Sequence, residues 1–285
     1  MITAEVKVGV ICNNNCKFCL NDARDWELGT KTIKFEIDHY IRAGVQSITF
    51  TGGEVTIRKD FFEILDYALR KCQTVIIQTN GRSLSYQKIA QALKSKPIYL
   101  LISLHAHTPE LYKKISRTDG YHQVMKGIKN LKQAGLKFGI NTVVCDENIH
   151  EIPDIIEHHS KINPEMIQLS WIRPQGKAKK SSLIPFSPEN LEKLKKAIDY
   201  LIENNQKFGL ISIPPCILPE YDQYKRDPYH NMKIKTSESI ESAEHIIKRR
   251  KRYTTKCHPC RLKHLCEGIY KEYPIEFEKY LNPVN

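Results

Sequence analysis

Short apolar runs alternate with longer amphipathic segments over residues 5–205. The short runs are rich in Val, Ile and aromatic residues, and turn or polar residues follow each of them. This pattern is typical of parallel strands that are buried on both faces. It predicts six strands, which span residues 5–11, 46–50, 74–78, 97–103, 137–144 and 166–172.

The segments between these strands carry apolar residues at helical spacing. Clear examples are residues 60–71, residues 122–135, which stop at a glycine, and residues 187–205, which begin with the N-cap residue Ser187. Repeated strand–helix units build either a βα barrel or a doubly wound sheet. We expect an α/β fold with an open, partial (β/α)6 barrel over residues 1–205.

The pattern changes at the boundary between residues 205 and 206. Residues 206–285 show no sustained period, and their first part is rich in proline. A segment with so little regular pattern usually needs an external staple, and a bound metal can supply one. We therefore expect a small, irregular C-terminal extension over residues 206–285, built around a metal centre.

Composition narrows the class of protein. Of the 285 residues, 41% are hydrophobic, and 44 Lys and Arg against 32 Asp and Glu give a formal net charge of +12. This balance excludes wholesale disorder, and no apolar run approaches the ~20 residues of a membrane span. The N-terminal segment also lacks the pattern of a signal peptide. We expect a cytoplasmic protein without a membrane partner.

Nine cysteines, an odd number, occur in two clusters and three scattered positions. A reducing cytosol disfavours disulfides, so the clusters indicate metal binding. The first cluster, Cys12-x3-Cys16-x2-Cys19, directly follows the first predicted strand. Three thiolates on a short loop can hold three corners of an iron–sulfur cube and leave the fourth iron open. A zinc site is the alternative, but structural zinc takes four ligands and no fourth cysteine or histidine lies nearby.

With Phe18 before its last cysteine, this cluster resembles the signature of the radical SAM superfamily. The resemblance implies a [4Fe–4S] cluster whose open iron binds S-adenosyl-L-methionine (SAM). One electron would then cleave SAM to a 5′-deoxyadenosyl radical, which abstracts a hydrogen from a substrate. The protein itself would hold the cluster and SAM, position the substrate and exclude solvent.

Further motifs follow the predicted strands in the order of that superfamily. TGGE at residues 51–54 is similar to its GGE motif, with Val55 in place of the usual proline; TNG at 79–81, ISLHAH at 102–107 and INTVV at 140–144 follow. The similarity covers roughly residues 5–175, and it is closest to peptide-modifying maturases and the molybdenum-cofactor GTP-cyclising enzyme. Functional groups of βα barrels lie at these strand ends. The residues implied to bind the cofactor are Phe18, Gly52, Gly53, Glu54, Asn80, Ser103, Arg117, Asn141 and Val143.

The second cluster, Cys257-x2-Cys260-x5-Cys266, resembles part of the SPASM domain of peptide-modifying radical SAM enzymes. Tyr270 occupies the place of a fourth cysteine, so two auxiliary clusters cannot both be built. A single auxiliary [4Fe–4S] cluster can be built if Cys216 completes the ligand set. This arrangement would correspond to the shortened form of the domain called a Twitch domain. A structural zinc site with four cysteines is the alternative.

Three residues near the expected active face are candidates for catalysis: His105, Cys145 and Arg173. Cys145 could donate a hydrogen or act as an acid, although a packing role competes with this. His105 and His107 are expected to line the cavity as hydrogen-bond donors. Arg173, like Arg117, could grip a carboxylate of the cofactor or substrate.

The expected partners follow from the resemblance and the charge. A peptide is the leading substrate class, and a nucleotide or other small molecule is the second. The electron donor would be a flavodoxin or ferredoxin. The basic run 248–252 permits a rival hypothesis, a non-catalytic metal-bound protein that binds nucleic acid. Because few aromatic residues interrupt this run, we rank nucleic acid below the other substrates.

Overall fold

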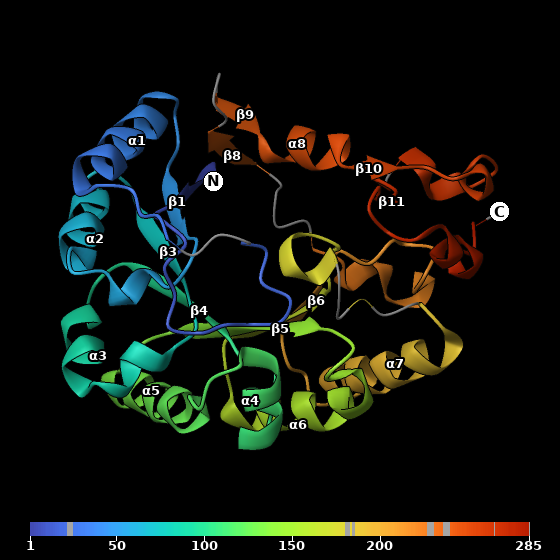
Figure 1. Ribbon diagram of the computed structural model, residues 1–285, viewed down its shortest axis with the longest axis horizontal. Coiled ribbons are helices and arrows are strands. Elements are labelled where there is room, and N and C mark those ends of the chain that lie inside the picture. The colour runs from blue at the N-terminus through green and yellow to red at the C-terminus, as the bar shows by residue number, and fades with distance from the viewer. Residues whose placement is uncertain are drawn as a thin grey trace.

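A curved parallel sheet forms the centre of the computed structural model (Figure 1). The structure describes residues 1–21, 25–179, 183, 186–226, 231–235, 240–264 and 266–284. All six predicted strands are present and pair with their neighbours in chain order. They are β1 (Thr3–Lys7), β2 (Ser47–Thr51), β3 (Thr74–Thr79), β4 (Ile98–Ser103), β5 (Phe138–Val144) and β6 (Met166–Trp171).

The helices cover the outer face of the sheet, as a partial βα barrel requires (Figure 1). The three segments that we assigned to helices form α2, α5 and α7. Gly135 ends α5 in the left-handed conformation (φ 70°), and Ser187 Oγ caps α7 by accepting from Asn190 N (3.3 Å). The bounds are α1 (Thr30–Arg42), α2 (Phe61–Leu69), α3 (Gln87–Leu93), α4 (Pro109–Ser116), α5 (Tyr121–Ala134), α6 (Ile152–Ile162) and α7 (Pro188–Glu203).

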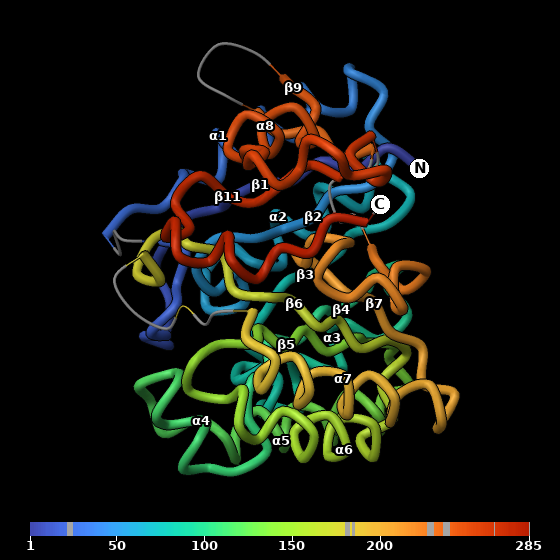
Figure 2. Tube along the Cα trace, turned by 90° about the vertical axis from the view of Figure 1, so that its right-hand side faces the viewer, coloured from blue at the N-terminus to red at the C-terminus, as the bar shows by residue number. Residues whose placement is uncertain are grey.

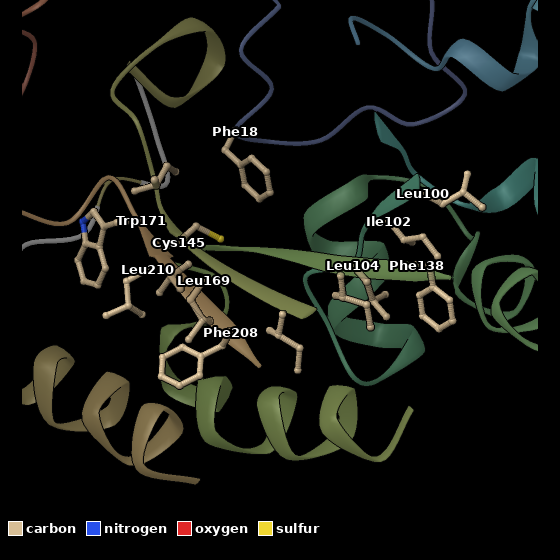
Figure 3. Packing of buried hydrophobic residues seen from close by; sticks show 14 of the residues in the cluster. Phe18, Leu100, Ile102, Leu104, Phe138, Cys145, Leu169, Trp171, Phe208 and Leu210 are labelled. Atoms are coloured by element: carbon tan, nitrogen blue, oxygen red, sulfur yellow. The ribbon is translucent and has the colours of Figure 1, made fainter. Parts of the chain in front are cut away.

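Each strand has an outer face that packs on the helices and an inner face that lines a cavity. In β6, Leu169 and Trp171 are buried in the hydrophobic core (Figure 3), whereas Gln168 and Ser170 alternate with them and line the cavity. The strands are therefore not apolar on both faces. Their polar positions mark the inside of the barrel.

Three strands beyond residue 205 join the same sheet, which the sequence pattern did not predict. β7 (Phe208–Ile211) pairs with β6, and β8 (Met232–Lys235) pairs in parallel with β1. β9 (Ile240–Ser242) then adds to β8 in antiparallel fashion. The barrel sheet thus continues into the segment that we assigned to the extension, across the 205/206 boundary.

The rest of the C-terminal extension has little regular structure, as expected. It consists of α8 (Ala243–Arg249), the two-residue strands β10 (Lys251–Arg252) and β11 (Ile269–Tyr270), and short 3-10 turns. Figure 1 shows β8 and β9 next to β1, whereas β10 and β11 lie on the opposite side of the molecule from α1; the orange and red part of the tube in Figure 2 traces these elements from a second side. No helix in the described part of the chain is long and apolar enough to cross a membrane.

Tyr40 of α1 fastens the added strand β8 to the barrel. Its hydroxyl donates to Glu5 O of β1 (3.2 Å) and accepts from Lys235 N of β8. Only 1% of the Tyr40 side chain is exposed, so water does not replace these bonds. A single buried hydroxyl therefore connects a helix to two strands.

We predict that Tyr40→Phe lowers the free energy of unfolding by about 1–2 kcal/mol, because it leaves a buried N–H of β8 without its acceptor. Urea denaturation measures the change. The control is Tyr86→Phe at an exposed tyrosine, for which we expect a change within ~0.5 kcal/mol. Equal effects of the two substitutions would contradict the role of Tyr40.

Candidate active site

A cavity of about 560 Å³ opens at the carboxyl ends of the barrel strands. It collects residues that are far apart in the sequence, from the loop after β1 to the segment after β6. Many of the site residues expected from the sequence line this cavity: Cys12, Cys16, Phe18, Cys19, Gly52, Gly53, Glu54, Asn80, Ser103, His105, Asn141, Val143 and Arg173.

Two glycines bring the end of β2 into backbone contact with the cysteine loop. Gly53 N donates to Gly9 O (2.9 Å), and Glu54 N donates to Ile11 O (2.8 Å). A Cβ atom on Gly53 would lie 2.0 Å from Ile11 O, and one on Gly52 would lie 2.2 Å from Gly9 O. No residue with a side chain fits at either position unless the backbones separate.

The buried carboxylate of Glu54 stabilises the backbone contact between the end of β2 and the cysteine loop. Only 2% of Glu54 is exposed. Its oxygens accept from Thr56 N (3.1 Å), Thr56 Oγ1 (2.5 Å), Thr79 Oγ1 (2.7 Å) and Asn80 N (2.6 Å). Because protein donors engage both oxygens, the Glu54 side chain ties the end of β2 to the end of β3, and only the backbone of this motif is left for a ligand.

The cysteine loop itself is held by side chains that sequence reasoning missed. Arg82 donates to Asn13 O and to Asn14 Oδ1 (2.9 Å), and Asn14 Nδ2 donates to Tyr112 OH (3.1 Å). Asn80 Nδ2 donates to Asn13 Oδ1 (2.6 Å). The run of asparagines between the first two cysteines was the available signal, because each side-chain amide brings two donors and an acceptor that need partners when the loop is packed against the protein.

Two N–H groups point at the first thiol of the loop. Asn14 N lies 3.3 Å and Asn80 Nδ2 lies 3.8 Å from Cys12 Sγ. Hydrogen bonds to ligand sulfurs are a feature of iron–sulfur sites. No three His, Cys, Asp or Glu side chains in the described ranges lie close enough to hold a single metal ion.

His105 lines the cavity as a neutral side chain. Its Nδ1 accepts from Val143 N (3.0 Å), and its ring meets Phe18 edge-on at 5.0 Å. Burial lowers the pKa of His105 to about 4, so the ring is uncharged near pH 7. Nδ1 accepts, so Nε2 carries the proton and is the atom that can donate to a ligand.

Three expectations near the active face need correction. Cys145 is fully buried among hydrophobic residues (Figure 3), burial raises the pKa of its thiol, and it does not line the cavity. Arg117 is exposed at the end of α4 and also lies outside the cavity. His107 lies beside Glu151 (3.9 Å) instead of lining the cavity with His105. Packing, not catalysis, is the role that the structure supports for Cys145.

Glu5 of β1 is a cavity residue that the sequence did not reveal, because it lies before the cysteine motif on a strand that read as apolar. Burial raises the pKa of its carboxyl group, and the positive charges of Arg173 and Lys7 partly offset this. Arg173 Nε donates to Ser212 Oγ (3.2 Å). The cavity wall therefore holds a carboxyl group and two basic side chains, Lys7 and Arg173.

The four cysteines of the extension are brought together. Burial, together with the negative charges of Cys266, Cys257 and Cys260, raises the pKa of Cys216 to about 11. Cys266 Sγ accepts from Gly268 N (3.3 Å), and Cys257 Sγ accepts from Thr254 N (3.5 Å). Cys216, which lies far away in the sequence, is thus close enough to the other three cysteines for their charges to act on its thiol.

The basic run 248–252 is mostly paired with carboxylates. Arg249 contacts Glu241 (2.8 Å) and Lys251 contacts Glu267 (2.5 Å), while Arg250 lies 3.6 Å from Glu272 and Arg252 pairs with Glu278. These side chains are therefore engaged within the extension. This arrangement disfavours a phosphate-binding surface, in agreement with the low rank that we gave to nucleic acid.

Comparison with known proteins gives one family match. The model of the Radical SAM superfamily matches residues 6–159. Fe-coproporphyrin III synthase of Methanosarcina barkeri is 28% identical over 238 residues, which cover 82% of this chain and 58% of that protein. A probable GTP 3′,8-cyclase of Metallosphaera sedula is 31% identical over 190 residues, which cover 64% of this chain and 59% of that protein. The chain thus spans less than two thirds of these relatives.

Two solved structures resemble the whole chain. SuiB of Streptococcus suis bound to S-adenosylmethionine has a TM-score of 0.72 and 17% identity, and the match covers 95% of this chain and 73% of SuiB. Native anSMEcpe with bound AdoMet has a TM-score of 0.70 and 14% identity, and the match covers 95% of this chain and 90% of anSMEcpe. At these identities the likeness shows the fold, a barrel with a C-terminal extension.

We predict that Gly53→Ala lowers the free energy of unfolding by roughly 1–3 kcal/mol, because the new methyl group forces the end of β2 away from the cysteine loop. Gly29→Ala is the matched control, since a Cβ at Gly29 meets no atom within 4 Å and its φ is −65°. Chemical denaturation of both variants checks this. A Gly53→Ala protein as stable as the control would refute the close contact.

Proposed function

The chain belongs to the radical SAM superfamily, and from this premise we propose that Cys12, Cys16 and Cys19 hold a [4Fe–4S] cluster and that SAM binds in the adjoining cavity. The protein is an enzyme. The observation that carries the proposal is the meeting of the three thiols, the backbone of Gly52–Gly53 and the polar side chains of β3–β5 in one cavity.

The chain offers groups that fit the polar parts of SAM. Gln175 Nε2 is buried in the cavity wall and has no hydrogen-bond partner in the described part of the chain. Asn141 and Ser103, neighbours on β5 and β4, line the same wall. When cluster and cofactor are bound, one electron cleaves SAM to a 5′-deoxyadenosyl radical that removes a substrate hydrogen.

The extension supplies the groups that keep water from this cavity. Met232 and Ile234 of β8 and Ile246 and Ile247 of α8 form an apolar wall across from the glycines. A reactive carbon radical must meet its substrate before it meets solvent or a protein side chain, so an enclosed, dry cavity is essential. The extension is therefore part of the active site.

A peptide is the substrate that we favour. The fold neighbour SuiB has also been solved with its precursor peptide SuiA, and that structure matches 95% of this chain with a TM-score of 0.73. Both neighbours carry the extension that this chain shares. A cavity lined by a carboxyl group, basic side chains and apolar residues accommodates the backbone and side chains of a peptide.

A nucleotide or other small molecule is the second candidate. The curated relatives carry names of GTP cyclase and porphyrin enzymes, not of peptide maturases. Arg173 lines the cavity, and guanidinium groups bind phosphates and carboxylates. The third hypothesis, a non-catalytic nucleic-acid-binding protein, is excluded by the family.

We also propose a second, auxiliary [4Fe–4S] cluster held by Cys216, Cys257, Cys260 and Cys266. The mutual repulsion of their thiolates and the N–H groups aimed at their sulfurs support it. A structural zinc site on the same four cysteines is the alternative. An electron donor such as a flavodoxin or ferredoxin would reduce the clusters.

We predict that the anaerobically reconstituted, dithionite-reduced protein forms 5′-deoxyadenosine from SAM and that Cys16→Ala abolishes it, because a cube on two thiolates is not retained. Liquid chromatography measures the product. The matched control is Cys72→Ala, a thiol remote from both clusters that should leave the rate unchanged. Equal rates of 5′-deoxyadenosine formation in Cys16→Ala and the wild type would contradict the proposal. In the same assay, stimulation by added GTP would favour the second substrate class over peptides.

We predict that the reconstituted wild type holds about eight irons per chain and the double variant Cys257→Ala/Cys260→Ala about four, because a cube contributes four irons. Iron and zinc analysis by mass spectrometry measures both metals. About four irons and one zinc in the wild type would overturn the auxiliary cluster but leave the catalytic one intact.

A further inference from the structure

The segment that follows β6, residues 172–178, touches both the C-terminal extension and the catalytic cysteine loop. We infer that Tyr273 of the extension is a positioning residue for the catalytic site, which acts through this bridging segment on the cysteine loop and on the SAM cavity. The inference rests on the proposed function, because it requires SAM to bind beside Cys12, Cys16 and Cys19.

Tyr273 joins the extension to the start of the bridging segment. Its hydroxyl donates to Ile172 O, the first carbonyl after β6. The side chain is 4% exposed and packs among aromatic rings, with centroids 5.3 Å from Phe277 and 6.1 Å from Phe186. Burial also raises the pKa of Tyr273, so its hydroxyl stays a neutral donor. The hydrogen bond is shielded from water, so no solvent molecule can donate to Ile172 O in place of the Tyr273 hydroxyl.

The other end of the bridging segment grips the cysteine loop. Lys177 N donates to Cys19 O (2.9 Å), and Lys177 Nζ donates to Asn15 Oδ1 (2.6 Å). Gly176 has a φ of 55°, and a Cβ there would lie 2.4 Å from Cys19 O. These contacts leave little freedom between residues 176–177 and the third ligand of the proposed cluster.

Between its two ends the bridging segment also contributes to the cavity. Ile172, Arg173 and Gln175 line it, and Gln175 presents the buried, unpartnered Nε2 group described above. A displacement at Ile172 would therefore move cavity groups and the Cys19 backbone together. The extension thus reaches the SAM site through one short, tightly held stretch of backbone.

Tyr273 could instead serve the packing of the extension only. The two roles differ in what they predict for SAM. A packing role lowers the stability of the protein and leaves SAM affinity unchanged, whereas a positioning role weakens SAM binding in protein that is still folded and loaded with its clusters.

The test is Tyr273→Phe, which removes the hydroxyl and keeps the ring. Tyr270→Phe is the matched control: Tyr270 is equally buried, its ring lies 6.4 Å from that of Tyr273, and its hydroxyl has no hydrogen-bond partner among the described residues. We expect the Kd for SAM to rise roughly threefold to tenfold in Tyr273→Phe, the equivalent of one buried hydrogen bond, and to stay within about twofold of the wild type in Tyr270→Phe.

Two further readouts do not depend on turnover. The electron paramagnetic resonance spectrum of the reduced protein should respond to SAM at higher SAM concentrations in Tyr273→Phe than in Tyr270→Phe. Amide hydrogen exchange of residues 12–19 should increase in Tyr273→Phe alone. Iron content and thermal unfolding of both variants verify that folded, loaded proteins are compared.

A second pair of variants tests the other end of the bridge. Lys177→Met removes the side-chain bond to Asn15, and Lys179→Met changes an exposed lysine that directly follows the segment. SAM affinity should fall in the first and not in the second. The inference is overturned if Tyr273→Phe binds SAM as the wild type does, whatever the affinity of Lys177→Met. If the wild type itself fails to bind SAM, the proposed function has failed instead.

Discussion

The close backbone contact between Gly52–Gly53 and residues 9–11 is the constraint on which the site depends. It fixes the cysteine loop against the end of β2 at a distance that excludes any side chain. Glu54 then carries the constraint to the end of β3 through Thr79 and Asn80. Cofactor-binding groups from three strands are held in register by backbone contacts and one satisfied buried carboxylate, and such a site is preorganised before any ligand binds.

Most of the barrel could be predicted from the sequence, because apolar runs that pack on helices are a strong local signal. The exceptions are informative. β1 covers residues 3–7, not 5–11, because residues 8–10 leave the strand to bond with Thr51 and Trp26. The short strands β7–β9 are stabilised by neighbours that already exist in the sheet, so their own sequences carry little pattern.

The sequence predicts which residues line the cavity where strand alternation holds, and it fails to do so where the alternation stops. Asn141 and Val143 share the inner face of β5, and continued alternation would place Cys145 there too. β5 ends at Val144, however, and Cys145 N donates to Asn148 Oδ1 (2.8 Å) in the following turn, which directs the thiol into the core. His107 is lost from the cavity in the same way, because β4 ends at Ser103. Arg82 and Tyr112 are tertiary partners that no local pattern reveals.

The added strand β8 shows why the extension belongs to the active site. A six-stranded barrel leaves β1 with a free edge, and an unpaired edge strand is a liability. β8 covers that edge, and the chain that continues from it places the apolar residues of α8 over the cavity. The match to the superfamily ends at residue 159, before any of these elements. Residues 6–159 therefore carry the motifs shared across the superfamily, and β8 and α8 add apolar residues to the wall of the same cavity.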